Sequence, residues 1–424
     1  MTEEERARTM AVSVKEGASF SVQQGLGERN VQPFAVFLGA SAGWFGLAIG
    51  LAAFAGGICQ ILGANTVDRA GRRKWYIVTG AVVQALSWLL VVATMGFPLP
   101  WSVAILVLSQ VLYFASVHFT VPAWFSIMGD VVPAERRGRY FGVRNFWCGT
   151  ALFATFAGSA FVLDRAKEGE WLAGAFALLF AGSLVARLVS ARYLGLMHDP
   201  AYAPSAADRF TLVEFVKRAP RANYGRFVFF SAAISGAIAI AGPFFGYYML
   251  QDLGWSYTDY MVALNVQLLV LFSTQPLWGR IADRVGNRIV LSLGSLGIAA
   301  IPLLWLVSSG RWWLFGVQAL DGLVFSAFQL ASGNYILDCV TPPKRARCTA
   351  YYTFFCNSGV LLGALLGGLL FDAAPAGASV LGVPFARPFH LVLVASFVPR
   401  ALTCLLFLPA MREMRLAPAP VSIE

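Results

Sequence analysis

The chain has 424 residues, of which 58% are hydrophobic and 13% are charged, and it carries a formal net charge of +10. Soluble domains contain about a quarter charged residues, so this composition excludes a soluble globular protein. It favours a protein that crosses a membrane many times, because apolar stretches of about 20 residues, the length that spans a bilayer, recur along the whole sequence.

Twelve membrane-spanning segments are predicted. Loops rich in Lys and Arg alternate between them with loops that hold few cations, which accounts for the net charge without a nucleic-acid partner. The positive-inside rule then places both termini and the long middle loop in the cytoplasm, in a multi-pass protein of the cytoplasmic (inner) membrane. The acidic start MTEEERARTM has no apolar core, so no cleaved signal peptide is expected. In chain order the predicted segments are 14–38, 43–63, 75–96, 101–128, 141–163, 171–194, 223–250, 257–278, 289–308, 312–337, 350–371 and 388–410.

The first of these segments is unusually polar, and the alternative is a cytoplasmic tail followed by an odd number of helices. An internal repeat argues against that alternative, because landmarks recur in the same order at nearly one offset. Asp68 and Asp283 are 215 residues apart, and Arg187 and Arg400 are 213 apart. The sequence therefore predicts two copies of a six-helix unit. They form an N-terminal bundle at 1–195 and a C-terminal bundle at 223–424, joined by a cytoplasmic interdomain loop at 196–222.

Two charged phrases connect this organisation to a known family. ANTVDRAGRRK (64–74) and GRIADRVGNR (279–288) resemble the loop signature of the major facilitator superfamily, and PAERRGRYFG (133–142) is similar to another of its loops. Ala64 departs from the signature, which begins with Gly. The resemblance extends through the repeat to essentially the full chain. It implies an all-α polytopic membrane protein, with twelve transmembrane helices in two pseudo-symmetric six-helix bundles, that moves a small molecule by alternating access.

The same resemblance implies a cytoplasmic gate, which holds that side closed in one state and releases it in the other. The acidic residues of the two phrases are expected to accept hydrogen bonds from helix N-terminal amides of the opposite half, and the cations to bridge to acids or lipid phosphates. The alternative is that the cations only hold the loops in the cytoplasm. Arg144 is expected to pair with Asp130, or else to bind an anionic substrate. The predicted gate comprises Asp68, Arg69, Gly71, Arg72, Arg73, Asp130, Arg137, Arg144, Gly279, Asp283, Arg284 and Gly286.

A polar stripe marks the first segment. Ser21, Gln24, Glu28 and Gln32 follow one another at steps of three, four and four, which places them on one helix face. Such a face belongs against a watery cavity. An ionisable group at bilayer depth costs about 2.5–3.5 kcal/mol on insertion scales, so Glu28 is the preferred proton carrier. The alternative is a structural pair with the adjacent Arg29 or with a partner helix.

Further candidates lie in other segments. Asp321 is expected to pair with Arg29 or to assist a proton relay. Arg187 and Arg400 lie about ten residues before their helix ends, so snorkelling to the interface or packing is expected of them. The histidines and cysteines show no metal-binding spacing, and neither a metal nor a cofactor is expected. The remaining cavity candidates are Tyr113, His118, Trp124 and Tyr247.

One short motif is typical of an enzyme and not of a transporter. GASAG (39–43) fits the Gly-x-Ser-x-Gly pattern of hydrolases, but no strand precedes Ser41. Its repeat equivalent is Ser256, and each stands just before a helix, where Ser is a common N-cap. The sequence thus predicts a monomeric secondary transporter with a small organic substrate, protons and membrane lipid as its partners. An uncoupled facilitator or a symport uptake system is the alternative, and a non-transporting receptor or scaffold is the remote one.

Overall fold

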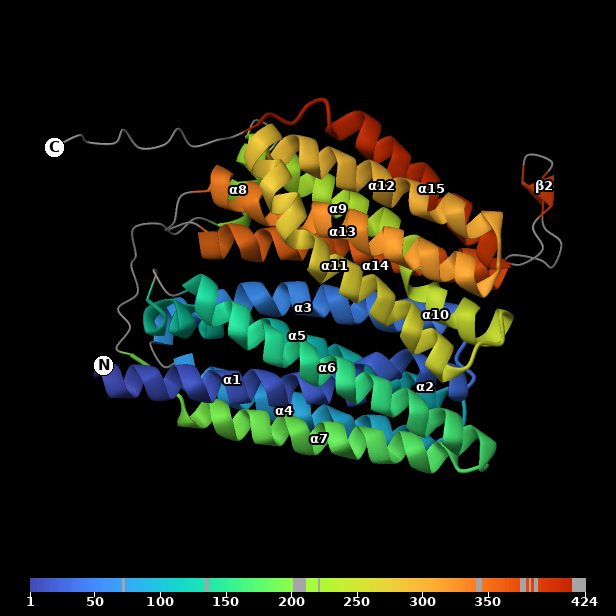
Figure 1. The fold of residues 1–424 in the computed structure, drawn as a ribbon, viewed down its shortest axis with the longest axis horizontal. Helices are drawn as coiled ribbons and strands as arrows, with labels where there is room; N and C mark the ends of the chain where they lie inside the picture. Colours follow the sequence, from blue (N-terminus) through green and yellow to red (C-terminus); the bar gives the residue numbers. More distant parts are fainter. Residues whose placement is uncertain are drawn as a thin grey trace.

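The structure is a computed structural model. It describes residues 1–70, 73–133, 137–200, 211–219, 222–340, 345–373, 379–380, 383–384 and 388–413. Long helices that run along one direction dominate it, and they stack as two layers of bundles (Figure 1). Within the described residues, eleven helices have the length and apolarity to cross a membrane. The polar α1, which lies alongside them, completes the twelve expected.

The first bundle occupies the lower half of Figure 1. Its elements are α1 (Glu3–Leu26), η1 (Glu28–Asn30), α2 (Val31–Phe37), α3 (Ala42–Ala70), α4 (Arg73–Ala93), η2 (Thr94–Gly96), α5 (Trp101–Val131), α6 (Arg137–Glu168) and α7 (Leu172–Leu196).

The second bundle occupies the upper half. A short helix, α8 (Leu212–Arg218), precedes it. A hairpin of two strands of two residues each lies in the connection between its last two helices. Its elements are α9 (Asn223–Ala241), η5 (Gly242–Phe244), α10 (Phe245–Tyr247), η6 (Tyr248–Asp252), α11 (Tyr257–Val285), α12 (Asn287–Val307), α13 (Arg311–Cys339), α14 (Arg345–Ala373), β1 (Ser379–Val380), β2 (Val383–Pro384) and α15 (Pro388–Phe407).

The first segment is not the single helix that the polar stripe predicts. α1 begins at Glu3 instead of residue 14, ends at Leu26, and is followed by the 3₁₀ turn η1. Asn30 explains how the interruption survives among packed helices. Its buried amide donates to the carbonyl oxygens of Gly25 (3.0 Å) and Leu26 (2.9 Å) and to Ser159 on α6 (2.9 Å). Backbone groups left unpaired by a broken helix must find protein partners inside a bilayer, and Asn30 supplies one.

Glycines let helices pack closely in the second bundle. Gly359, Gly363 and Gly367 lie on one face of α14, at the spacing that favours close helix contact. A Cβ atom on Gly363 would overlap the carbonyl oxygen of Gly236 on α9. α14 therefore packs closely against α9 along this face.

Glycines also bring the two bundles together, along α3 and α14. A Cβ atom on Gly46 would overlap the carbonyl oxygen of Ala364, and one on Gly50 would lie 3.0 Å from the Leu361 side chain. Backbones thus touch across the bundles over several turns of helix.

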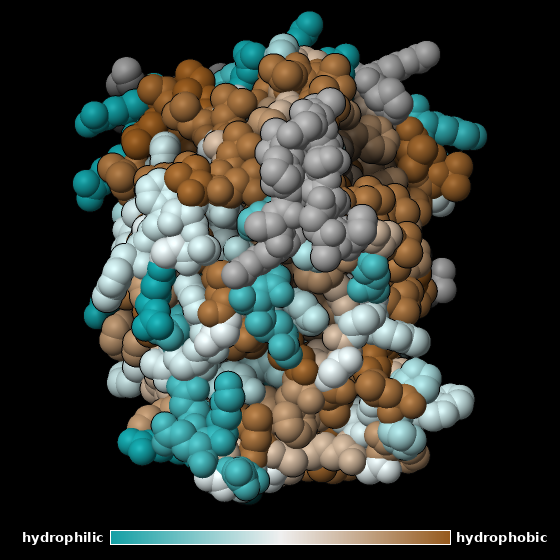
Figure 2. All heavy atoms as spheres, turned by 90° about the vertical axis from the view of Figure 1, so that its right-hand side faces the viewer, coloured by the Kyte–Doolittle hydropathy of each residue, from teal (hydrophilic) through white to brown (hydrophobic). Residues whose placement is uncertain are grey.

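The end of the molecule where α2 and α10 lie, called the closed end below, is joined by two reciprocal carboxylate caps. Asp164, near the end of α6, accepts from the backbone amides of Tyr257 (2.8 Å) and Thr258 (2.9 Å) at the start of α11. Asp372, near the end of α14, accepts from the Gly43 amide (3.0 Å) at the start of α3. Each bundle therefore caps a helix of the other. Figure 2 looks onto this end and shows hydrophilic residues on it, between hydrophobic margins.

The two caps are equivalent in the repeat. Asp164 and Asp372 are 208 residues apart, the spacing of Asp130 and Asp338. Ser41 and Ser256 stand before the two capped helices, and the expectation that both serve as N-caps is confirmed. Ser256 Oγ accepts from the Asp259 amide at 3.0 Å, and Ser41 Oγ lies 3.5 Å from the Trp44 amide nitrogen.

Replacing Gly363 by Ala is expected to lower the midpoint of thermal unfolding in detergent. The methyl group must displace the α9 backbone, and overpacking of this kind costs about 1–3 kcal/mol. Gly316→Ala is the matched control, because a Cβ atom at this exposed position of α13 meets nothing within 4 Å. Equal midpoints for the two variants would show that the α9–α14 contact is not tight.

Candidate functional site

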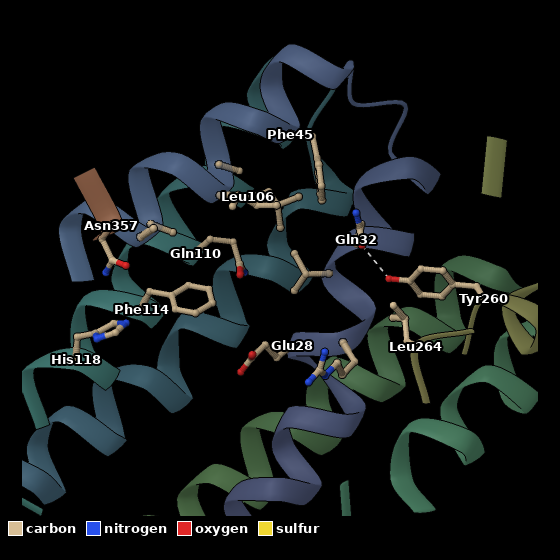
Figure 3. Close-up of a pocket in the computed structure, with 16 residues that line it drawn as sticks. Glu28, Gln32, Phe45, Leu106, Gln110, Phe114, His118, Tyr260, Leu264 and Asn357 are labelled. Atoms are coloured by element: carbon tan, nitrogen blue, oxygen red, sulfur yellow. Dashed lines mark hydrogen bonds between the residues drawn. The ribbon is translucent and has the colours of Figure 1, made fainter. Parts of the chain in front are cut away.

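A cavity of about 430 Å³ lies between the two bundles. Figure 3 shows Glu28 and Gln110 near its middle, His118 and Asn357 toward one side, and Gln32 with Tyr260 toward the other. α3, α5 and the broken first segment line it from the first bundle, and α11 and α14 from the second. The lining residues are Glu28, Arg29, Val31, Gln32, Phe45, Ala48, Ile49, Ala52, Ala53, Leu106, Gln110, Phe114, His118, Tyr260, Leu264 and Asn357.

Glu28 is held by neutral donors. Its Oε2 accepts from the Tyr113 hydroxyl at 2.7 Å and from the Gln24 amide at 3.2 Å, and Gln23 in turn donates to Tyr113 at 3.0 Å. No ion pair between Glu28 and Arg29 appears among the described contacts. The bond from Tyr113 on α5 is a contact with a partner helix, the other form of the structural alternative.

Gln32 joins the two bundles beside the cavity. Its amide donates to the carbonyl oxygen of Pro243, and its Oε1 accepts from the Tyr260 hydroxyl at 2.8 Å. The polar stripe is thus only partly a cavity face. Glu28 and Gln32 line the cavity, Gln24 supports Glu28, and Ser21 is buried beside Cys148 of α6.

The aromatic and histidine candidates separate in the structure. Tyr113 is buried against Glu28, and His118 lines the cavity with its Nδ1 2.9 Å from the Gln60 amide oxygen. Trp124 lines a smaller cavity of about 200 Å³ within the first bundle, under the Arg144 guanidinium. Tyr247 lies in α10 at the closed end, packed edge-on against Phe371.

Asp321 does not pair with Arg29, although this pairing was one of the two roles expected for it from the sequence. It is buried inside the second bundle, where the Gln267 amide donates to it and Arg400 attracts it electrostatically. The Arg400 guanidinium donates to the carbonyl oxygens of Ile298 (2.9 Å) and Ile238 (3.3 Å). The prediction that Arg187 and Arg400 snorkel to the interface is wrong, because both side chains are almost fully buried.

A buried acid that the sequence analysis missed accounts for Arg187 and Arg144. Glu16 Oε2 pairs with Arg144 at 3.0 Å, and its Oε1 lies 3.6 Å from Arg187. Arg144 therefore pairs with Glu16 instead of Asp130. The available signal was an acid within the first predicted segment, 14–38, because an ionisable group at bilayer depth is costly and calls for a partner.

Asp130 pairs instead with Arg73, at the end of the molecule opposite the closed end. The fully buried Arg73 guanidinium donates to Asp130 at 2.6 Å and to Ser126 at 2.8 Å, and lies 2.9 Å from Asp199. Asp199 also accepts from the Lys74 amide at 3.0 Å, which caps the start of α4. Arg73 thus locks α4 to α5 and to the chain after α7 within its own bundle.

The second bundle repeats this arrangement with one change. Glu413 accepts from the backbone amides of Asn287 (3.0 Å) and Arg288 (2.7 Å), and the Asn287 amide replaces a guanidinium in binding Asp338 at 2.8 Å. Asp199 and Glu413 were both missed by the sequence analysis. Their separation of 214 residues, which equals that of Arg73 and Asn287, was the signal that could have found them.

The remaining predicted gate residues are placed as follows. Gly286 ends α11 with φ of 96°, which favours glycine, and a Cβ atom there would approach Glu413 at 2.7 Å. Asp283 and Arg284 are exposed on the last turns of α11, and Gly279 is half-buried one turn before them. The side chains of Asp68, Arg69, Arg72 and Arg137, together with Gly71, lie outside the described residues.

Comparison with known proteins identifies the fold. The Major Facilitator Superfamily matches residues 227–421. The multidrug resistance protein MdtG of Salmonella choleraesuis is 33% identical over 140 residues, which are 32% of this chain and 34% of that protein. The MdtG of Proteus mirabilis is 28% identical over 152 residues, which are 34% of this chain and 37% of that protein. The chain thus spans only about a third of the length of these curated relatives.

Two solved transporters share the whole fold at low sequence identity. The xylose transporter XylE from E. coli, in a partially occluded inward open conformation, superposes with a TM-score of 0.69 and 13% identity, covering 98% of this chain and 100% of that one. The nucleoside transporter NupG superposes with a TM-score of 0.67 and 13% identity, covering 96% and 98%. The C-terminal half of the chain thus matches the Major Facilitator Superfamily, and the whole chain shares the fold of these two transporters, in agreement with its paired loop signatures, its repeat and its twelve helices.

Proposed function

We propose that this protein is a secondary transporter that moves a small organic molecule across the cytoplasmic membrane by alternating access. The observation that carries the proposal is Glu28, an ionisable group that lines a cavity between two bundles and is held by neutral donors. The family consists of transporters, not enzymes. A protonatable carboxyl at the site around which two halves rock is the arrangement that proton coupling requires.

The orientation follows from the cations. The positive-inside rule puts the end with the Arg73 network in the cytoplasm, so the closed end faces outward. The described structure then represents a state sealed outward by the Asp164 and Asp372 caps and by Gln32. Opening outward breaks these bonds, and the predicted gate around Asp68 and Asp283 closes the cytoplasmic side in exchange.

Asp321 has an assisting role in this proposal. It is an acid buried among α11, α13 and α15, with Arg400 as its counter-charge, so a change in its protonation alters the charge balance inside the second bundle. The competing functions are an uncoupled facilitator and a symport uptake system. MdtG is named a multidrug resistance protein, which makes proton-driven export the third outcome to distinguish.

Glu28→Gln is expected to abolish substrate-driven proton movement in proteoliposomes that contain a pH-sensitive dye, because an amide keeps the hydrogen-bonding shape but cannot carry a proton. A mixed compound panel is screened first with the unmodified protein, and each active compound is then tested with the variant. Glu168→Gln is the control, since Glu168 is exposed at the end of α6 and far from the cavity.

The direction of proton flux separates the candidate mechanisms. Protons that move with the compound indicate symport, and protons that move against it indicate antiport. Labelled compound that equilibrates equally in both proteins without any proton movement would leave a facilitator. No movement of any panel compound by either protein would favour the receptor alternative.

Replacing both Asp164 and Asp372 by Ala is expected to shift the protein toward the outward-open state. Hydrogen bonds to charged groups contribute about 1.5–3 kcal/mol each, and the variant loses them across the bundles on one side only. Ala53, which lines the cavity, is replaced by Cys in a cysteine-free background, and its labelling by a membrane-impermeant thiol reagent from outside is followed.

Asp259→Ala provides the matched control for this accessibility experiment. Asp259 lies at the same end but bonds only within its own bundle, to Ser256 and Arg311. Labelling that rises several-fold in the double variant and not in the control supports the caps as the outer seal. Equal labelling in both would mean that the seal lies elsewhere.

A further inference from the structure

Arg29 is the cation that lines the central cavity, and no described residue pairs with its guanidinium. Its side chain is half-buried and lines the cavity beside Tyr260. Among the residues that the structure describes, it forms no hydrogen bond or ion pair. The other half-buried or buried arginines discussed above are bound to carboxylates or carbonyl oxygens. A guanidinium held away from bulk water without an acceptor is costly, so this one needs a partner from outside the protein.

A second unmet donor lies in the same cavity. The side-chain nitrogen of Asn357, on α14, is buried and has no hydrogen-bond partner in the described part of the chain. The acceptors of the cavity are better satisfied, because Glu28 Oε2 already receives two hydrogen bonds and the Gln32 oxygen already receives one. A proton taken up by Glu28 would occupy its remaining oxygen, Oε1. The cavity therefore has hydrogen-bond donors without partners, and a ligand that carries acceptor atoms would satisfy them.

The charges of the lining residues point the same way. Glu28 and Arg29 are the acid and the base among them, and His118 and Tyr260 are the further titratable groups. When Glu28 takes up a proton, one net positive charge remains. That state accepts one anionic group without leaving a buried charge unbalanced.

The rest of the lining is apolar and aromatic. Phe45, Leu106 and Phe114 lie across the cavity from Glu28 (Figure 3), with Ile49 and Leu264 also in the wall. The volume of about 430 Å³ lies in the lower part of the range of small-ligand sites, about 300–1,000 Å³. A ligand of this size with an apolar body fits these walls.

We propose that the substrate is a small amphipathic organic monoanion. Its anionic group binds the Arg29 guanidinium, an acceptor atom binds Asn357, and its apolar or aromatic body packs against Phe45, Leu106 and Phe114. This inference rests on the proposed transport function and names the substrate class for the same cavity.

The charge class also sets the direction of coupling. The groups around Glu28 are Tyr113 and His118 from α5, Arg29 from its own segment, and Arg187 from α7, which acts on Tyr113. An anion on Arg29 adds negative charge beside Glu28 and favours its protonated form, so anion and proton occupy the cavity together. A cationic substrate would instead compete with the proton. Anion and proton therefore move in the same direction.

Binding to the purified full-length protein tests this with three probes of one shape. The probes are 2-naphthalenesulfonate, 2-naphthalenesulfonamide and 2-naphthyltrimethylammonium, which carry charges of −1, 0 and +1 at every working pH. Isothermal titration is expected to give the tightest binding for the sulfonate. Arg29→Gln weakens sulfonate binding about ten- to a hundredfold, the range of a charged hydrogen bond, and changes the sulfonamide by less than about threefold. Arg29→Lys keeps part of the affinity.

Two further variants keep the result interpretable. Arg165→Gln is the matched control, because Arg165 is exposed at the end of α6 and pairs with Glu168. Asn357→Leu weakens sulfonate binding without removing a charge, so it tests the second donor even if Arg29→Gln proves unstable on gel filtration. In the unmodified protein sulfonate affinity falls as pH rises, whereas in Glu28→Gln that fall is reduced.

The contrary results are equally specific. Tighter binding of the ammonium probe, equal binding of all three probes, or no sulfonate binding would overturn the anion assignment. Sulfonate affinity that is insensitive to pH in the unmodified protein would overturn the joint occupancy by anion and proton. Anion binding without transport in proteoliposomes would leave this inference standing and remove the proposed function, while transport of only neutral or cationic compounds would do the reverse.

Discussion

The site depends on one interrupted helix. Inside a bilayer a helix cannot stop without leaving backbone groups that only the protein can satisfy. Here Asn30 satisfies the carbonyl oxygens of Gly25 and Leu26 and ties the break to Ser159. The break turns the chain by a 3₁₀ step at residues 28–30, and this step carries Glu28 and Arg29 into the same cavity without an ion pair between them.

The two copies of the repeat share the same helices, but equivalent residues in them have different partners. Tyr113 and Asp321 occupy equivalent positions, 208 residues apart, yet the first donates to Glu28 in the cavity and the second is enclosed within its bundle with Gln267 and Arg400. Arg187 likewise faces a glutamate where Arg400 faces backbone carbonyl oxygens. The two bundles have the same scaffold, while the ionisable groups that reach the cavity come from the first. This division suits a transporter in which one half carries the site and the other supplies a complementary wall.

The spacing of residues in the sequence predicted the number of helices and the candidate acid Glu28. It did not predict the burial of side chains or the contacts between residues far apart in the chain. The nearly constant offset between Asp68 and Asp283 correctly implied twelve helices, and with them a polar first helix that hydropathy alone passes over. Glu28 could be singled out because an acid in an apolar context costs free energy wherever it lies. The burial of Arg187 could not be read from its position, since a one-residue rotation moves a side chain from lipid to core. Asp164 and Asp372 lie at polar helix ends, where an acid raises no suspicion, and their partners are in the opposite bundle.

The strengths of the contacts between the bundles indicate which ones yield during transport. The glycine-lined seam of α3 and α14 brings backbones into contact away from water, and separating it would open a void that neither lipid nor water fills well. The carboxylate caps lie on partly exposed helix ends, so water replaces much of what is lost when they break. Reversing a two-state equilibrium from 1:99 to 99:1 takes about 5.5 kcal/mol of differential binding. A few water-exposed bonds to charged groups, each worth about 1.5–3 kcal/mol at most, fall within that range. In the proposed alternating-access cycle, the seam would therefore act as the pivot, and the caps would be the contacts that binding energy opens.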